Sequence, residues 1–152
     1  MTAILAIDPG SEQSAWLAYD ATAGVLEFAI DPNDVLLRNL RIGRWAVGSV
    51  VIEQIRSYGM SVGAEIFDTV HWAGRFTEAA EATELSVHQL PRLAVKQAIC
   101  HDTRAKDANI RQALIDRFGG TPAIRKGGVL YGISKDVWSA LAIAVTWSEG
   151  GR

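Results

Sequence analysis

The sequence predicts a mixed α/β fold, in which helices pack on both faces of a sheet. Two short, mostly apolar runs at residues 3–7 and 49–53 are typical of buried strands. Between them, residues 14–19 and 25–30 form two more strand-like segments, and the loop at 20–24 suits a hairpin. The later part of the chain instead carries apolar residues at helical spacing. Strands that give way to interspersed helices predict a mixed sheet covered by helices.

The middle of the chain continues this pattern. The turn sequence at 31–34 leads into a short helix that we expect to be capped by Asp34. The run at 49–53 is apolar enough to lie inside the sheet. After a break at 57–59, a helix is predicted to extend to about Ala82. It is indicated by apolar residues at helical spacing: Val62, Ile66, Val70 and Ala73.

The last part of the chain is mostly helical. One strand and three helices are expected there, at residues 84–89, 92–100, 106–118 and 135–148. Pro91 suits the start of a helix, since its missing N–H is not needed there. The glycine-rich segment at 119–132 is expected to be a loop.

Length and composition indicate one cytoplasmic domain. The 152 residues suffice for one core and are too few for two ordinary domains, so residues 1–152 are taken as a single domain. No apolar run reaches the roughly 18–20 residues that span a bilayer, and the N-terminus lacks signal-peptide features. The single cysteine, Cys100, is expected to be a buried thiol in a reducing compartment. We therefore expect no membrane partner.

Charge is unevenly distributed along the chain. The formal net charge is −2, yet residues 92–135 contain nine Lys or Arg against three Asp. A basic C-terminal part is compatible with DNA on one side of the molecule, although a solvated helical surface would show the same composition.

Three acidic residues stand where functional sites are often built. Asp8 ends the first apolar run, Glu53 ends the second, and Asp136 opens the final apolar helix. A carboxylate at the end of a buried strand lies at the rim of the sheet. Clustered carboxylates repel one another unless a cation joins them, and Mg²⁺ and Mn²⁺ prefer such ligands. Two such ions about 3.5–4 Å apart commonly cut phosphodiesters, so the pattern predicts a metal-dependent nuclease.

Each acid also has a purely structural interpretation. Asp8 precedes Pro9-Gly10 and could simply bond turn N–H groups. Glu53 could be the first solvated residue after its strand. Asp136 could be an N-terminal cap, where negative charge is favoured. The functional hypothesis therefore depends on the three acids meeting in space.

Four segments resemble the RuvC family of Holliday junction resolvases, in the RNase H-like superfamily. They appear in family order at residues 4–11 (ILAIDPGS), 51–54 (VIEQ), 95–97 (VKQ) and 136–144 (DVWSALAIA). The short length resembles a bacteriophage or prophage member. The resemblance implies an RNase H-like mixed five-stranded sheet, with the first three strands antiparallel and helices on both faces.

The resemblance also implies an endonuclease that nicks two strands of a four-way junction symmetrically. Asp8, Glu53 and Asp136 would hold two Mg²⁺ ions, for which Mn²⁺ substitutes. These ions would activate water and stabilise the leaving 3′-oxygen, giving a 5′-phosphate and a 3′-hydroxyl. Lys96 matches a family lysine near the scissile phosphate. The helix at 62–80 would form a homodimer, and a branch-migration helicase is a possible partner.

The chain departs from the family pattern at a fourth carboxylate position, where it has Ser139. Asp107 or Asp102 could substitute for the missing acid. Ser139 and water could instead suffice as metal ligands, or catalysis could be impaired, which would leave a junction-binding protein. A working enzyme with Ser139 in the metal site is the favoured interpretation, because the other three acids stand in their motifs.

A second departure follows Glu53, where the family places an aromatic wedge. Here the position is Arg56, with Tyr58 and Met60 close behind. Arginine can stack on bases and bind phosphate, and Tyr58 could stack from a shifted position. Five further residues are candidates for contacts with the DNA backbone: Arg104, Lys106, Arg111, Arg125 and Lys126.

Three other functions compete with junction cleavage. A nuclease of the same fold could act on flaps, forks or RNA–DNA hybrids, since active-site residues do not choose among these. A non-catalytic junction-binding protein would explain Ser139. A sugar-kinase or actin-like ATPase needs two such domains around a nucleotide cleft, and this chain has room for one.

Overall fold

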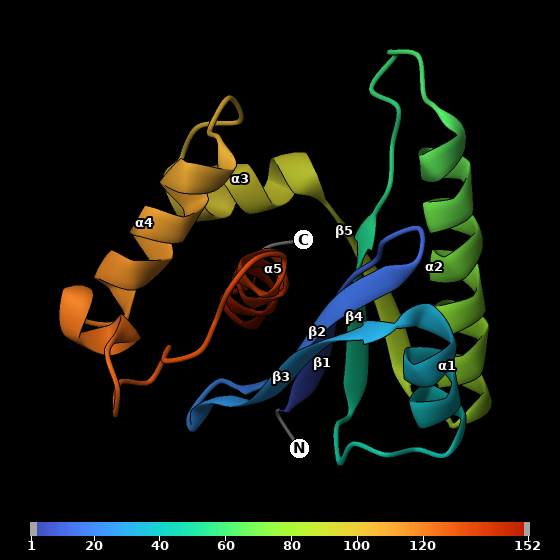
Figure 1. The fold of residues 1–152 in the computed structure, drawn as a ribbon, viewed down its shortest axis with the longest axis horizontal. Helices are drawn as coiled ribbons and strands as arrows, with labels where there is room; N and C mark the ends of the chain where they lie inside the picture. Colours follow the sequence, from blue (N-terminus) through green and yellow to red (C-terminus); the bar gives the residue numbers. More distant parts are fainter. Residues whose placement is uncertain (1–2, 151–152) are drawn as a thin grey trace.

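A five-stranded sheet in the order β3-β2-β1-β4-β5 forms the centre of the computed structural model, which describes residues 3–150 (Figure 1). The first three strands are an antiparallel meander, and β4 and β5 continue the sheet in parallel with β1. Their bounds are β1 Ile4–Asp8, β2 Gln13–Asp20, β3 Gly24–Pro32, β4 Ser49–Gln54 and β5 Ser86–Pro91. The predicted mixed sheet with three antiparallel strands is confirmed.

The uniform hydrophobicity of β1 reflects its central place in this sheet. Ile4 and Ala6 pack into the core on one face, whereas Leu5 and Ile7 pack into the core on the other. A strand buried on both faces cannot alternate apolar and polar residues.

Helices cover both faces, as predicted. One face carries α1 (Asn33–Arg41) and α2 (Ala64–Ala82). The opposite face carries α5 (Val137–Ser148), with α3 (Arg92–Cys100) and α4 (Asp107–Arg117) packed outside it (Figure 1). A short 3-10 helix, η1 (Thr121–Ile124), lies within the segment expected to be a loop.

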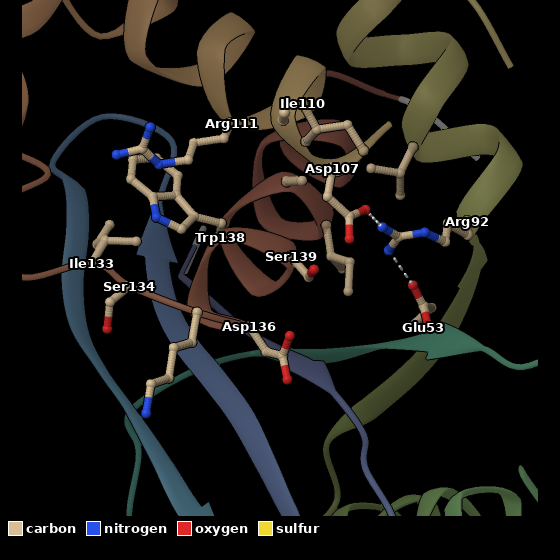
Figure 2. Close-up of a pocket in the computed structure, with 15 residues that line it drawn as sticks. Glu53, Arg92, Asp107, Ile110, Arg111, Ile133, Ser134, Asp136, Trp138 and Ser139 are labelled. Atoms are coloured by element: carbon tan, nitrogen blue, oxygen red, sulfur yellow. Dashed lines mark hydrogen bonds and ion pairs between the residues drawn. The ribbon is translucent and has the colours of Figure 1, made fainter. Parts of the chain in front are cut away.

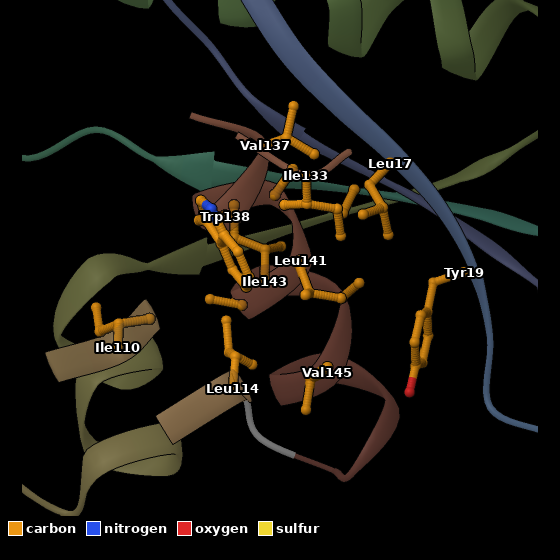
Figure 3. Close-up of a cluster of buried hydrophobic side chains, with 14 of the residues drawn as sticks. Leu17, Tyr19, Ile110, Leu114, Ile133, Val137, Trp138, Leu141, Ile143 and Val145 are labelled. Carbon is orange, nitrogen blue, oxygen red and sulfur yellow. The ribbon is translucent and has the colours of Figure 1, made fainter. Parts of the chain in front are cut away.

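Helix α5 is buried on nearly all sides because it lies between the sheet and α4. Leu141 and Val145 share one core cluster with Leu17 of β2 and Leu114 of α4 (Figure 3). A helix that is apolar all round is one enclosed in the core. This packing brings the first residues of α5 to the edge of the sheet where β1 and β4 end.

Two helices begin differently from the predictions. Helix α1 starts at Asn33, one residue before the expected cap Asp34, because the buried Asn33 side chain bonds to Ser14 and Gly10. Helix α2 starts at Ala64, two residues after Val62.

The buried side of α2 also differs from the pattern that predicted the helix. Its buried large side chain is Phe76, whereas Ile66, Phe67 and Val70 are 37%, 65% and 48% exposed. The apolar spacing at the start of α2 therefore marks an exposed stripe rather than part of the core.

The expected burial of the Cys100 thiol is only partial. Cys100 is only partly buried against the core beneath α3, because it lies at the end of that helix. Desolvation by burial, followed by the charge of Asp102, raises the pKa of its thiol. Within residues 3–150, no helix is both long and apolar enough to cross a membrane.

Candidate active site

The three predicted acids meet at one edge of the sheet. Asp8 is the last residue of β1, and Glu53 is the second-last residue of the neighbouring parallel strand β4. The register pairs Ile7 with Ile52, which places the two carboxylates at adjacent strand ends. Asp136 stands at the N-cap of α5, and its charge acts on both Asp8 and Glu53.

Asp8 does not play the turn-stabilising role that its sequence context allowed. Within residues 3–150 its carboxylate forms no hydrogen bond and no ion pair. The Gly10 N–H instead donates to the Ser14 hydroxyl at 3.1 Å. Desolvation by burial raises the pKa of Asp8 well above its usual value, and the charges of Glu53 and Asp136 raise it further. Asp8 is thus a half-buried acid that is costly to ionise, and of the charges near it within residues 3–150 only that of Arg92 opposes this effect.

The turn after Asp8 is held by other residues. Ser14 Oγ donates to Asn33 Oδ1 at 2.6 Å, and Asn33 Nδ2 donates to the Gly10 carbonyl at 2.9 Å. A Cβ at Gly10 would lie 2.2 Å from the carbonyl oxygen of Gln13, so only glycine fits there. This network positions the end of β1 and leaves the Asp8 carboxylate unused.

Asp136 does not act as a side-chain cap either. It occupies the N-cap position of α5, yet its carboxylate makes no capping hydrogen bond. The preceding residue, Lys135, adopts a left-handed conformation with φ +49°. Asp136 is exposed and lines the pocket at the start of α5.

Arg92, which the sequence did not single out, bridges two of the pocket acids. Its Nη1 donates to Glu53 Oε1 at 3.2 Å, and its Nη2 donates to Asp107 Oδ1 (Figure 2). Desolvation by burial raises the pKa of Glu53 although the Arg92 guanidinium opposes this effect. Burial alone would lower the pKa of Arg92, but the charges of Glu53 and Asp107 raise it overall. Arg92 follows β5 directly, so its place at the end of a parallel strand was a signal available in the sequence.

These side chains surround a pocket of about 380 Å³ (Figure 2). Glu53, Arg92 and Asp107 form one side of its polar lining, and Asp136 and Ser139 come from α5. The lining also includes two basic residues and one aromatic residue: Arg111, Lys135 and Trp138. Lys135 is a second pocket residue that the sequence analysis missed.

Ser139 and Asp107 both lie at the pocket where a fourth metal ligand would be expected. Ser139 is half-buried and lines the pocket one helical turn after Asp136. Asp107 also lines this pocket, from the first residue of α4. Asp102 does not line it and pairs with Arg104 at 3.3 Å. Of the two alternative acids, only Asp107 reaches the site.

The predicted DNA-binding residues are spread over several surfaces. The Arg111 guanidinium lies 5.1 Å from the Trp138 ring centroid and reaches the pocket. Lys96 is half-buried on α3, one turn after Arg92, and is not a lining residue. The other predicted residues are exposed and lie outside the pocket lining: Arg56, Tyr58, Arg104, Lys106, Arg125 and Lys126.

The donor set suits a hard divalent cation. Four carboxylates lie at or beside the pocket (Asp8, Glu53, Asp107 and Asp136), and Arg92 pairs with two of them. Oxygen ligands of this kind are those that Mg²⁺ prefers. Across the described residues 3–150, no three acidic, histidine or cysteine side chains stand close enough to hold one ion as they are. Arg92 engages two of the four acids, so metal binding would require these side chains to adjust.

Known structures share this fold. Thermus thermophilus RuvC in complex with a Holliday junction substrate has a TM-score of 0.72 and 19% identity, covering 96% of this chain and 92% of its own. The yeast mitochondrial Holliday junction resolvase Ydc2 has a TM-score of 0.65 and 11% identity, covering 95% and 77%. The fowlpox virus resolvase, in complex with Holliday junction DNA, has a TM-score of 0.52 and 11% identity, covering 97% of each chain.

No protein-family model and no curated protein sequence matches the chain. At these low identities the structural similarities establish the fold. The similarity in fold to RuvC and other Holliday junction resolvases and the predicted mixed five-stranded sheet are confirmed.

Proposed function

We propose that this protein is a metal-dependent endonuclease that resolves Holliday junctions and related branched DNA. The observation that carries the proposal is the state of Asp8. Its carboxylate is desolvated beside Glu53 and Asp136 and has no hydrogen-bond or ion-pair partner within residues 3–150. A fold maintains such a group where its charge is used. The shared fold of three junction resolvases supports the choice of substrate.

Asp8, Glu53 and Asp136 would hold Mg²⁺ or Mn²⁺, with Ser139 at the position of the family's fourth ligand. Two such ions would supply water activation and stabilisation of the leaving 3′-oxygen. The protein's part is to hold the carboxylates at the sheet edge and to receive the scissile phosphate in the open pocket. Cleavage would leave a 5′-phosphate and a 3′-hydroxyl.

Basic residues near the pocket would position the DNA backbone. Arg111 and Lys135 line the pocket itself, and Lys96 lies one turn beyond Arg92 on α3. The exposed basic residues would extend this contact: Arg104, Lys106, Arg125 and Lys126. Phosphate contacts of this kind set affinity and salt sensitivity rather than specificity.

The segment between β4 and α2 would reach the centre of the junction. Arg56 is exposed there, and its Nε donates to Gln54 Oε1 at 2.7 Å. Tyr58 is exposed and has a left-handed backbone conformation with φ +50°. An exposed aromatic beside an arginine suits stacking on an unpaired base.

Homodimerisation through α2 would match the near two-fold symmetry of a four-way junction. The stripe formed by Ile66, Phe67 and Val70 is exposed and apolar, which suits burial against the same stripe of a second copy. Phe67→Glu should convert a dimer of the 16.4 kDa chain into a monomer in gel filtration. Leu26→Glu is the matched control, because Leu26 is similarly exposed on β3. A wild-type monomer at micromolar concentration would contradict dimerisation.

Cleavage of a labelled mobile four-way junction in Mg²⁺ and in Mn²⁺ tests the proposed function. Wild-type protein should produce paired symmetric nicks, and Asp8→Asn should produce none. Asp34→Asn is the matched control, because Asp34 is an exposed acid on α1.

The same experiment separates the competing functions. Intact junctions with retained binding in both metals would favour a non-catalytic junction-binding protein. Faster cleavage of flaps, forks or RNA–DNA hybrids in a panel of defined substrates would change the assigned substrate and leave the nuclease chemistry in place.

A further inference from the structure

We infer that Asp107, carried by α4, supplies the fourth carboxylate of the metal site in place of Ser139, and that Arg92 holds Asp107 beside Glu53 in the metal-free protein. The inference rests on the proposed nuclease function and concerns how this chain completes its site.

The first argument is the shared guanidinium. Asp107 and Glu53 bond to the two terminal nitrogens of Arg92, so the exposed acid of α4 is held next to the buried acid of β4 (Figure 2). Both side chains line the pocket that Asp136 and Ser139 also line. Asp107 is therefore an acid from outside the expected motifs that the fold delivers to the site.

The second argument is that the Asp107 side chain is not needed to cap α4. It stands in the first turn of α4, where an acid often acts on the helix N-terminus. Here the Asn109 side chain accepts the Lys106 N–H at 2.9 Å and serves the capping role. The Asp107 side chain is 83% exposed, so it can reorient toward an ion at little cost.

The third argument is charge. Ser139 brings a neutral hydroxyl, which is a weak ligand for Mg²⁺ and does not offset a dication. Asp102 is engaged by Arg104 and lies outside the pocket lining. Asp107 alone among these candidates adds negative charge to the site.

Arg92 is then expected to weaken metal binding. Its guanidinium already pairs with both Glu53 and Asp107, so an entering ion must compete with it for both carboxylates. Removing the guanidinium should tighten metal binding, because the same acids would then face the ion unpaired. A simpler view is that Asp107 serves only to hold Arg92 in place.

A double-mutant cycle read by calorimetric titration with Mn²⁺, without DNA, distinguishes these two roles. We expect Arg92→Gln to tighten Mn²⁺ binding severalfold. We expect Asp107→Asn to weaken binding by about tenfold both in the wild-type background and in the Arg92→Gln background. Asp102→Asn is the matched control and should leave the affinity unchanged. If Asp107→Asn has no effect once Arg92 is Gln, Asp107 merely holds Arg92 and the inference is overturned.

A rescue experiment moves the carboxylate to the other helix. Ser139→Asp in the Asp107→Asn protein should restore Mn²⁺ affinity to near the wild-type value, because α5 would then supply the missing charge. A double variant as weak as Asp107→Asn alone would count against a shared ligand position. A circular dichroism spectrum of each variant shows that the fold is retained.

The two proposals fail in different ways. Mn²⁺ binding that Asp8→Asn abolishes and that Asp107→Asn leaves intact in both backgrounds overturns this inference and preserves the proposed function. Wild-type protein that binds no Mn²⁺, or binds it equally after Asp8→Asn, overturns both.

Discussion

The strand-borne acids of the site (Asp8 and Glu53) differ physically from its helix-borne acids (Asp107 and Asp136). Asp8 lies beside the pocket, and the other three acids line it. Glu53 and Asp107 bond to the same guanidinium, yet their side chains are 12% and 83% exposed. Burial is also the main cause of the raised pKa values of Asp8 and Glu53. The strand-borne acids are thus rigidly placed and costly to ionise, whereas the helix-borne acids are solvated and free to adjust.

This difference indicates a division of roles. The positions of the acids at strand ends are set by the register of β1 and β4, so these acids give a metal site two ligands in fixed positions. Acids at helix starts depend on how α4 and α5 pack, and they can close around an ion after it enters. Replacing Asp8, the strand-borne acid without an ion-pair partner among the described residues, should therefore lower the cleavage rate and raise the stability of the metal-free protein.

The largest expected effect is on cleavage. Asp8→Asn should lower the junction cleavage rate by at least about 100-fold, beyond the 10–100-fold typical of outer-shell groups. The loss should persist at high Mn²⁺, because no neighbouring group can replace a fixed strand-borne ligand. Asp107→Asn should recover as Mn²⁺ is raised, and initial rates against Mn²⁺ concentration measure the contrast. If raised Mn²⁺ restored the cleavage rate of both variants equally, the strand-borne and helix-borne acids would not differ as metal ligands.

Removing Arg92 should destabilise the metal-free protein. Arg92→Gln leaves Glu53 buried without its counter-ion, which we expect to cost about 1–2 kcal/mol. Thermal denaturation in EDTA should show a lower Tm, by roughly 2–4 °C per kcal/mol for a chain of this size. Arg104→Gln breaks the more exposed pair with Asp102 and should leave the Tm nearly unchanged, because solvent screens exposed ion pairs. Similar losses for both variants would show that burial of Glu53 is unimportant.

Asp8→Asn should stabilise the metal-free protein at neutral pH. It removes a desolvated charge beside Glu53 and Asp136, so the Tm measured in EDTA should rise. Asp136→Asn should give a smaller gain in the same EDTA denaturation, because Asp136 is exposed. A lower Tm for Asp8→Asn would indicate that its carboxylate has a stabilising partner.

The stability gain from Asp8→Asn should depend on pH. The folded-state pKa of Asp8 is raised above its unfolded value, so the wild-type carboxyl favours folding most at low pH, where it is protonated. That contribution is lost as pH rises through the raised pKa. The difference in Tm between variant and wild type should therefore be small in acid and grow toward neutral pH. A difference independent of pH would assign the gain to another cause.

The smallest expected effect is that of Ser139→Ala. If Asp107 completes the site, loss of the Ser139 hydroxyl should change the cleavage rate by less than about threefold, which corresponds to roughly 0.65 kcal/mol. Single-turnover rates at saturating metal measure this change. A loss of cleavage rate as large as that of Asp107→Asn would indicate that Ser139 of α5, rather than Asp107, is the fourth metal ligand.

Local patterns in the sequence were sufficient to predict much of the fold. The apolar runs that end in Asp8 and Glu53 predicted buried strands, because a strand covered on both faces is uniformly apolar. The apolar stretch after Asp136 predicted a helix, and the structure shows that this helix is enclosed in the core. The spacing of Ile66 and Val70 predicted the helix correctly but not its exposure, since periodicity alone does not tell a core face from a face free to bind a partner.

The sequence by itself determined the order of strands and helices along the chain, the approximate ends of most elements and the three acids in their motifs, because each of these depends on neighbouring residues. The order of the strands within the sheet was decided by the tertiary structure. Only the tertiary structure decided that Arg92 joins Glu53 to Asp107 and that Lys135 reaches the same pocket. Those contacts arise because Ile110 and Leu114 pack α4 against α5 on one face of the sheet (Figure 3). Such packing depends on residues far apart in the chain, and no local pattern records it.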